Sequence, residues 1–194
     1  VFRTPILISK VKPVVSCWKK PITIARHAYG DVYKSVDMYT TEPGTCTMTF
    51  KGESGMEKTL NVQTVDGPAV WQAQHNTEKS IRAFARACFQ YAINQKQDLW
   101  FSTKDTIAKG YDGAFQRIFE EEYESTYKAE FEKLGLTYFY TLIDDAVARV
   151  IRSKGGFIWA LKNYDGDVMS AMVATAFGSL AMMTSVLVSP DGTM

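Results

Sequence analysis

Aspartates that follow short apolar runs are the first residues of this sequence that could do chemistry. Asp144 follows the aromatic run 137–143, and Asp167 follows the apolar run 155–161, each close to a predicted helix. Ligand sites in open α/β sheets favour the carboxyl ends of strands, and carboxylates gathered there suit Mg²⁺ or Mn²⁺. Aspartate also caps helix N-termini and complements the helix dipole, so the pattern alone leaves both interpretations open.

Basic and phenolic residues could bind or protonate a substrate. Lys104 follows the predicted strand 99–103, and it is either a desolvated acid or base or an ordinary surface lysine. Arg3 and Arg26 could hold a substrate carboxylate through paired hydrogen bonds. Tyr33 could donate a proton. Residue types and spacing therefore predict an acidic, metal-binding cleft as one possibility, but they do not specify a reaction.

Alternating strand and helix patterns predict the elements that must position these residues. Strands are predicted at 21–25, 99–103, 137–143, 155–161 and 183–188. Helices are predicted at 81–92, 115–134, 146–152 and 168–177, with capping residues at 76–79 and Gly135. We expect the acidic residues 120–122 on an exposed helix face and residues 164–167 in a turn. Strands alternating with helices are typical of the α/β class.

Residues 31–78 follow a different pattern. The segments 45–50 and 58–63 alternate between apolar and polar residues, and glycines at 52 and 55 separate them. This pattern predicts a β-hairpin. Because two strands alone are only marginally stable, we expect the hairpin to be an interlocking arm at a dimer interface.

Composition excludes several classes of protein. The 22 Lys and Arg residues nearly balance the 21 Asp and Glu residues, and 46% of the chain is hydrophobic. These values argue against a disordered chain and against a nucleic-acid-binding protein held mainly by phosphate contacts. The most apolar stretch is interrupted by polar residues, so no membrane span is expected. Three scattered cysteines, Cys17, Cys46 and Cys88, predict reduced thiols in a reducing intracellular compartment.

Six segments together identify a family resemblance. They are residues 18–31, 101–106, 142–145, 155–159, 162–167 and 178–188. In this set and order the sequence resembles the NADP-dependent isocitrate dehydrogenases of the eukaryotic-type homodimeric class, most weakly over 35–78. The resemblance implies a small α/β domain of the isocitrate/isopropylmalate dehydrogenase type with an inserted antiparallel β clasp hairpin.

The resemblance also implies domain boundaries, a reaction and a partner. The expected parts are the small domain at 1–30 and 79–178, the clasp at 31–78 and the start of a large domain at 179–194. The implied reaction is the oxidation of isocitrate by hydride transfer to NADP⁺, followed by loss of CO₂ to give 2-oxoglutarate. The implied partner is a second copy, joined through the clasp. The mitochondrial matrix or the cytosol is the expected compartment.

Four residues match positions that contact or convert the substrate in the family. Arg3 and Arg26 match arginines that hold the substrate carboxylates. Tyr33 matches the tyrosine that protonates the enolate. Lys104 matches the catalytic lysine that reaches into the other subunit's site.

Metal and cofactor positions match as well, with one departure. Asp144 matches a metal ligand donated across the dimer, and Asp167 matches the metal ligand of the home subunit, for Mg²⁺ or Mn²⁺. Arg149 and Arg152 match positions that contact the neighbouring subunit's NADP. The family carries a further aspartate where this chain has Ala171, and an aspartate there would share a helix face with Asp167. We therefore expect weaker metal binding.

The family's further substrate and NADP segments would lie before residue 1 and after residue 194. We therefore expect the chain to be inactive alone. The alternative is a catalytically degenerate relative that serves as a structural subunit of a larger assembly.

Overall fold

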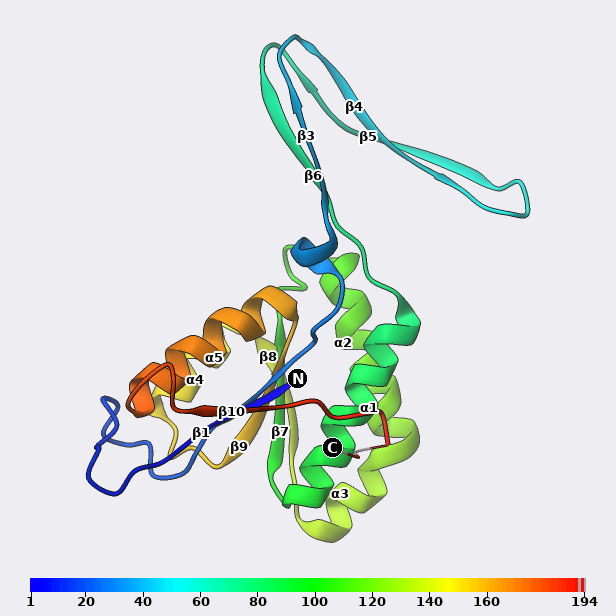
Figure 1. Cartoon of the computed structure of the whole chain (residues 1–194). Coiled ribbons are helices and arrows are strands. Elements are labelled where there is room, and N and C mark those ends of the chain that lie inside the picture. The colour runs from blue at the N-terminus through cyan, green and yellow to red at the C-terminus, as the bar shows by residue number, and fades with distance from the viewer. Residues whose placement is uncertain (192, 194) are drawn as a thin grey trace. The chain divides into compact units, whose positions relative to one another are not determined.

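The computed structural model describes residues 1–191 and 193. The chain forms two units (Figure 1). Unit 1 comprises Val1–Tyr33 and Asn76–Met194, and unit 2 comprises Lys34–His75. The assignment of these parts to a small domain and a clasp stays a prediction.

A mixed six-stranded sheet forms the centre of unit 1. Its strands are β1 (Phe2–Pro5), β2 (Thr23–Arg26), β7 (Asp98–Thr103), β8 (Tyr138–Leu142), β9 (Phe157–Leu161) and β10 (Met183–Val186). The order across the sheet is β10-β1-β2-β9-β7-β8. Strands β2, β9, β7 and β8 are parallel, whereas β1 is antiparallel to both of its neighbours. The carboxyl ends of the four parallel strands therefore lie along one edge of the sheet.

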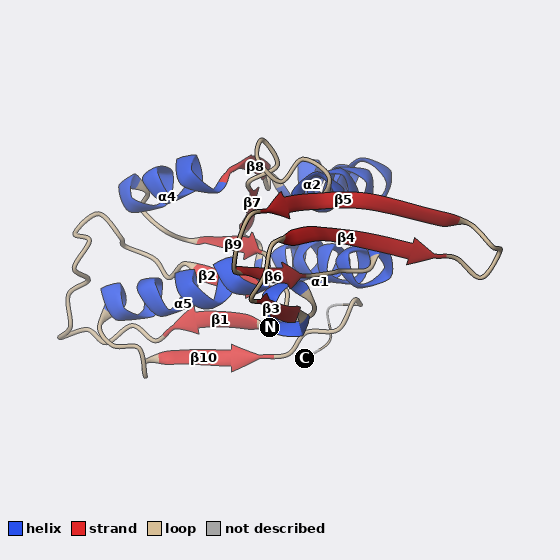
Figure 2. Cartoon of the chain, turned by 90° about the horizontal axis from the view of Figure 1, so that it is seen from above, coloured by secondary structure: helices blue, strands red, loops and turns tan. Residues whose placement is uncertain are grey.

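Helices cover both faces of this sheet. They are α1 (Glu78–Gln95), α2 (Tyr111–Glu122), α3 (Lys128–Leu134), α4 (Ile143–Arg152) and α5 (Asn163–Phe177). Figures 1 and 2 show α1, α2 and α3 on one side and α4 and α5 on the other. Alternate residues of β9 enter the two cores: Ile158 packs with the first group of helices and Trp159 with the second. The predicted α/β class is confirmed.

The ends of α1 and α3 follow the predicted capping chemistry. The backbone N–H of Ser80 donates to the side chain of Thr77, at 3.2 Å, as expected of an N-cap residue. Gly135 ends α3 in the left-handed conformation, with φ 66°. The long helix predicted at 115–134 begins earlier, at Tyr111, and a π-helical segment (Tyr123–Tyr127) interrupts it.

The expectation of an exposed acidic face at 120–122 is wrong for Glu122. Only 3% of its side chain is exposed, because Arg82 and Arg86 of α1 hold its carboxylate. Periodicity alone did not reveal this position, since a charged residue is buried only when a partner on another element pairs with it.

The expectation of a turn at 164–167 is also wrong. Helix α5 begins at Asn163, and the backbone N–H of Gly166 already donates to the carbonyl oxygen of Lys162 at 2.8 Å. Gly166 is there for its small size, because a Cβ at this position would lie 2.8 Å from the Cβ of Arg26. Because glycine has no side chain, α5 can pack closely against β2 at this point. Asp167 then lies in the second turn of α5 and not in a turn that precedes the helix.

Unit 2 contains two antiparallel strand pairs. The predicted hairpin is present as β4 (Gly44–Lys51) paired with β5 (Glu57–Val65), with an irregularity in the register between Cys46 and Thr47. A second pair, β3 (Val36–Thr40) with β6 (Ala69–Ala73), was not predicted. Its strands have five residues each, so they offer a shorter pattern than the eight residues of β4 and the nine of β5.

Two further features concern the cysteines and the lengths of the helices. Cys17, Cys46 and Cys88 are free thiols. Among the helices of residues 1–191, none combines the length and the apolar character that a membrane span requires.

Candidate functional site

Four predicted residues come together at one carboxylate, in a group that we call the Asp167 cluster: Arg3, Arg26, Tyr33 and Asp167. Arg3 donates from Nη1 to Oδ1 of Asp167 at 3.1 Å, and Arg26 donates from Nη1 to the same oxygen. The hydroxyl of Tyr33 donates to Oδ2 at 2.9 Å. The guanidinium of Arg26 also lies over the Tyr33 ring, 4.8 Å from its centroid. Two cations and a phenol thus surround one anion.

The sheet brings these residues together. Arg26 is the last residue of β2, and Arg3 lies on the neighbouring strand β1, where it pairs with Ile24. Asp167 lies on α5, which follows β9, and β9 pairs with β2 on its other side. The close approach of Gly166 to Arg26 completes the arrangement. As predicted, the acidic residue lies beyond the carboxyl end of a parallel strand.

A residue that sequence analysis missed fixes the segment that carries Tyr33. Asp31 is buried and has a positive φ of 55°. Its carboxylate accepts hydrogen bonds from the hydroxyl of Tyr111 at 2.5 Å and from the backbone N–H of Asn163 at 3.1 Å. A left-handed conformation is unfavourable for most non-glycine residues but more tolerated by aspartate. The Gly30–Asp31 pair was the available sequence signal for this turn.

The Asp167 cluster is partly open to solvent. The side chains of Arg3, Arg26 and Asp167 are 21%, 13% and 41% exposed. Partial burial alone would raise the pKa of Asp167, but the hydrogen bonds from Tyr33 and Arg3 and the charge of Arg26 hold that pKa below its ordinary value. The pKa of Tyr33 is raised, first by desolvation and then by its bond to Asp167. Asp167 is therefore an anion, and Tyr33 keeps its proton at neutral pH.

Lys104 and Asp144 form a separate pair further along the same edge. Lys104 directly follows β7, and its Nζ donates to Oδ1 of Asp144, near the start of α4, at 2.6 Å. The side chains are 38% and 65% exposed, so the lysine is ion-paired and not desolvated. The bond from Lys104 lowers the pKa of Asp144. Within residues 1–191, no hydrogen bond or ion pair joins this pair to the Asp167 cluster.

Arg149 and Arg152 line an open pocket of about 720 Å³ beside the edge strand β8. Trp100, Phe139 and Ser153 also line this pocket. Arg149 donates from Nε to Asp145 at 2.5 Å and lies over the Phe139 ring. Arg152 is exposed and makes no ion pair within the described part of the chain. A guanidinium without an ion-pair partner can bind a phosphate group, and the assignment of Arg149 and Arg152 to NADP stays a prediction.

The residues of one chain do not fit a divalent metal. Among the described residues, no three His, Cys, Asp or Glu side chains lie together in a way that could hold an ion. Asp167 is already bonded to Arg3, Arg26 and Tyr33, and Ala171 one turn later in α5 offers no oxygen ligand. The assignment of Asp144 and Asp167 as metal ligands thus stays a prediction.

Comparison with known proteins identifies the family. Residues 2–194 match the model of the isocitrate/isopropylmalate dehydrogenase family. The chain is 51% identical to the mitochondrial NADP isocitrate dehydrogenase of Saccharomyces cerevisiae, over 99% of this chain and 46% of that protein. It is 49% identical to the human mitochondrial enzyme, over 99% and 43% of the two chains. It is 50% identical to a peroxisomal NADP isocitrate dehydrogenase of Candida tropicalis, over 99% and 47%.

The chain therefore spans less than half the length of these relatives. The resemblance seen in the sequence is confirmed at the level of the family. This chain belongs to the isocitrate/isopropylmalate dehydrogenase family.

Proposed function

We propose that this chain supplies part of an active site for the NADP-dependent oxidation and decarboxylation of isocitrate to 2-oxoglutarate. The observation that carries this proposal is the convergence of Arg3, Arg26 and Tyr33 at Asp167. Two guanidinium groups in fixed positions are suited to a substrate that carries several carboxylates.

Three members of the Asp167 cluster have proposed roles in the reaction. Arg3 and Arg26 bind the substrate carboxylates and hold the substrate in the orientation that the reaction requires. Tyr33 holds its proton beside the carboxylate and delivers it to the enolate carbon after CO₂ leaves. A tyrosine with a raised pKa is protonated at neutral pH and can serve as this acid.

Lys104 and Asp144 act together in the proposed enzyme. They form an exposed pair that makes no contact with the Asp167 cluster of the same chain within residues 1–191. An exposed pair of this kind is available to a second subunit. We assign both residues to the site of a partner copy, with Lys104 as the proton-transferring lysine.

Arg149 and Arg152 are proposed to bind the phosphate end of NADP in the pocket beside β8. When bound, NADP supplies the nicotinamide that accepts a hydride. The arginines contribute charge and orientation, and Trp100 and Phe139 add aromatic surface to the same pocket.

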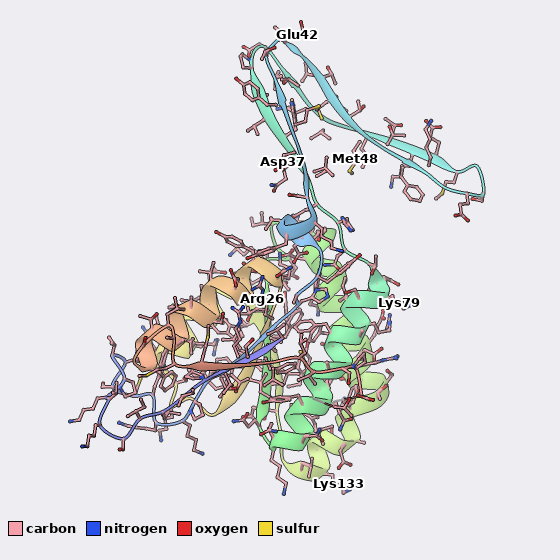
Figure 3. All side chains as sticks on the ribbon, in the orientation of Figure 1. Arg26, Asp37, Glu42, Met48, Lys79 and Lys133 are labelled. Atoms are coloured by element: carbon pink, nitrogen blue, oxygen red, sulfur yellow. The ribbon has the colours of Figure 1, made fainter. Side chains whose placement is uncertain are left out.

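Unit 2 is proposed to join two copies of the chain. Its strands expose apolar side chains that a solvated arm would not need: Val36 (73%), Met48 (54%), Val62 (54%) and Val70 (77%). Figure 3 labels Met48 on β4. Such residues bury well in an isologous interface.

We further propose that the chain does not turn over isocitrate alone, because Ala171 leaves Asp167 without a neighbouring carboxylate. A second candidate function follows from unit 2: its exposed apolar strands suit a structural subunit whose catalytic residues are no longer used. The proposed compartment is the mitochondrial matrix, as for the mitochondrial relatives.

The test is a reduction assay with NADP⁺, isocitrate and Mn²⁺, on the chain alone and mixed with candidate completing chains. Turnover only in a mixture supports the proposed enzyme, and Arg26→Gln or Lys104→Met in that mixture is expected to abolish it. Arg117→Gln, which changes an exposed arginine of α2, is the matched control and keeps activity. If the mixture is active and Arg26→Gln has no effect, the assigned site is wrong. No turnover in any mixture, with a stable dimer, favours the structural subunit.

A further inference from the structure

Both oxygens of the Asp167 carboxylate are already used within the chain. Oδ1 accepts hydrogen bonds from Arg3 and Arg26, and Oδ2 accepts the hydroxyl of Tyr33. A carboxylate bound in this way is satisfied by cations and a donor, which is the opposite of the environment that a metal ligand needs.

No group close to Asp167 among the described residues provides a free oxygen ligand for a cation. Ser170, which lies three residues after Asp167, accepts a bond from Arg3 at 2.8 Å and donates to the Asp167 carbonyl oxygen at 2.9 Å. Ala171, four residues after Asp167 on the same helix face, has no polar side chain. The described residues of the chain hold no three-ligand group elsewhere that could recruit a cation to this place.

We infer that Asp167 serves in this chain as the internal counter-ion of Arg3 and Arg26, and that a polycarboxylate binds these arginines without a divalent cation by displacing Asp167. This inference rests on the proposed function, because it concerns the ligand of the same site. The inference differs from the family-based expectation in the role of Asp167. In the expectation Asp167 helps to bind the ligand through a metal ion, whereas here it competes with the ligand for the two arginines.

Charge and exposure explain why displacement is feasible. Two guanidinium groups face one carboxylate, so the cluster keeps an excess positive charge that attracts an anion. The Asp167 side chain is 41% exposed, so it can turn toward water when a ligand carboxylate replaces it. A ligand with two or three carboxylates can engage both arginines at once, which a single aspartate does less well.

The experiment measures binding of propane-1,2,3-tricarboxylate to the full chain by calorimetry. This probe has the carboxylates of the proposed substrate but no hydroxyl to oxidise, so no cofactor enters the measurement. Titrations with Mg²⁺ and with NaCl at the same ionic strength are expected to give equal dissociation constants.

Two variants sharpen the test. Asp167→Asn removes the competing anion and is expected to tighten binding about tenfold without Mg²⁺. The matched control is Asp165→Asn, which changes a carboxylate on the same helix outside the Asp167 cluster and leaves the affinity unchanged. Ala171→Asp restores a second carboxylate and is expected to make binding depend on Mg²⁺. Circular dichroism of each variant checks that it is folded.

The outcomes separate the two proposals. Binding to the unmodified chain that requires Mg²⁺, or weaker binding by folded Asp167→Asn, overturns the counter-ion inference and leaves the proposed function intact. No binding under any condition overturns the counter-ion inference, whereas the proposed function is decided by the assay with completing chains. Equal affinity with and without Mg²⁺, together with tighter binding by Asp167→Asn, supports the inference whether or not a completed enzyme is active.

Discussion

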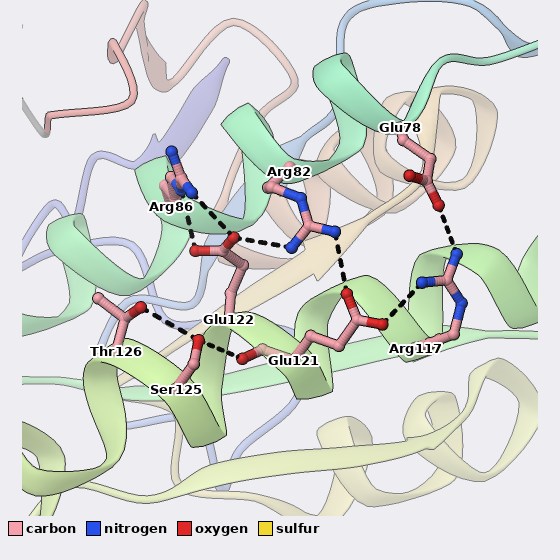
Figure 4. A network of polar contacts seen from close by, with 8 residues as sticks. All are labelled: Glu78, Arg82, Arg86, Arg117, Glu121, Glu122, Ser125 and Thr126. Atoms are coloured by element: carbon pink, nitrogen blue, oxygen red, sulfur yellow. Dashed lines mark hydrogen bonds and ion pairs between the residues drawn. The ribbon is translucent and has the colours of Figure 1, made fainter.

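Two carboxylates in this protein are each held by two arginines, yet they have different environments. Glu122 of α2 accepts hydrogen bonds from Arg82 and Arg86 of α1, and 3% of its side chain is exposed (Figure 4). Asp167 accepts from Arg3 and Arg26, and 41% of its side chain is exposed. Each site thus contains one carboxylate and two guanidinium groups. At Glu122 the carboxylate is buried between two helices, and at Asp167 it is accessible at the edge of the sheet.

The difference shows how burial decides what an ion pair does. The Glu122 network extends outward from α1 and α2 through Glu121 and Arg117 to Glu78, as Figure 4 shows. Every partner of Glu122 is on the neighbouring helix, so the network ties α1 to α2. Asp167 has a comparable set of donors, but water reaches it. Charges that solvent reaches can be exchanged for a ligand, whereas those of Glu122 cannot without separating the helices.

Among the substitutions, the largest expected effect comes from breaking the buried link. Glu122→Gln weakens the hydrogen bonds that Arg82 and Arg86 donate to this buried carboxylate and is expected to lower the free energy of unfolding by about 2 kcal/mol. Urea denaturation measures this value. Glu121→Gln is the matched control, because Glu121 is 43% exposed, and it is expected to cost clearly less than Glu122→Gln. Equal losses for the two variants would mean that burial does not distinguish them.

A change of pH tests the buried histidine that follows Arg26 in the chain. Burial lowers the pKa of His27 to about 4, and its Nε2 lies 2.8 Å from the hydroxyl of Ser80. Because the unfolded chain binds this proton more readily, stability is complete above about pH 6.5 and declines as the pH falls toward 4. The expected loss across this window is about 3 kcal/mol.

Urea denaturation at about pH 7 and about pH 5, between which about 2 kcal/mol of this loss is expected, checks this prediction. His27→Gln is expected to remove most of the pH dependence, and His75→Gln, which changes the other histidine of the chain, to retain it. A loss of stability that begins only below about pH 4.5 would instead assign it to carboxylates such as Glu122, whose lowered pKa is set by Arg86 and Arg82 against the effect of burial.

A smaller effect is expected at the accessible cluster. Asp167→Asn is expected to change the free energy of unfolding by no more than about 1 kcal/mol, because 41% of the Asp167 side chain is exposed and water screens its charge. The same urea experiment compares this variant with Glu122→Gln. A loss as large as that of Glu122→Gln would show that the Asp167 cluster is part of the folded framework and not a ligand site.

The smallest expected effect is the change that salt makes to the stability losses of the two variants. Raising NaCl from about 0.05 M to about 0.5 M is expected to reduce the stability change of Asp167→Asn to a few tenths of a kcal/mol. The change caused by Glu122→Gln is expected to persist, since buried pairs are screened less. Denaturation at the two salt concentrations checks both variants, and equal screening would contradict the difference in burial.

Local patterns predicted much of the framework. Thr77 and Gly135 identified helix ends because capping depends on a few adjacent residues. Alternation identified β4 and β5. Strands β3 and β6 were missed because five residues give a shorter pattern than the eight and nine residues of β4 and β5. Gly166 was taken as a turn residue, since its real role depends on the distance to Arg26, which no local pattern contains.

The sequence by itself determined the α/β class, the family and the residue types at the candidate site, because periodicity, capping and motif order are properties of adjacent residues. Tertiary structure alone decided which charges meet. Asp167 lies 164 positions from Arg3 and 141 from Arg26, and only the pairing of β1, β2 and β9 brings them together. It also decided that Glu122 is buried and Asp167 is accessible. Burial depends on what packs against a residue, and the order of residues in the chain does not state that.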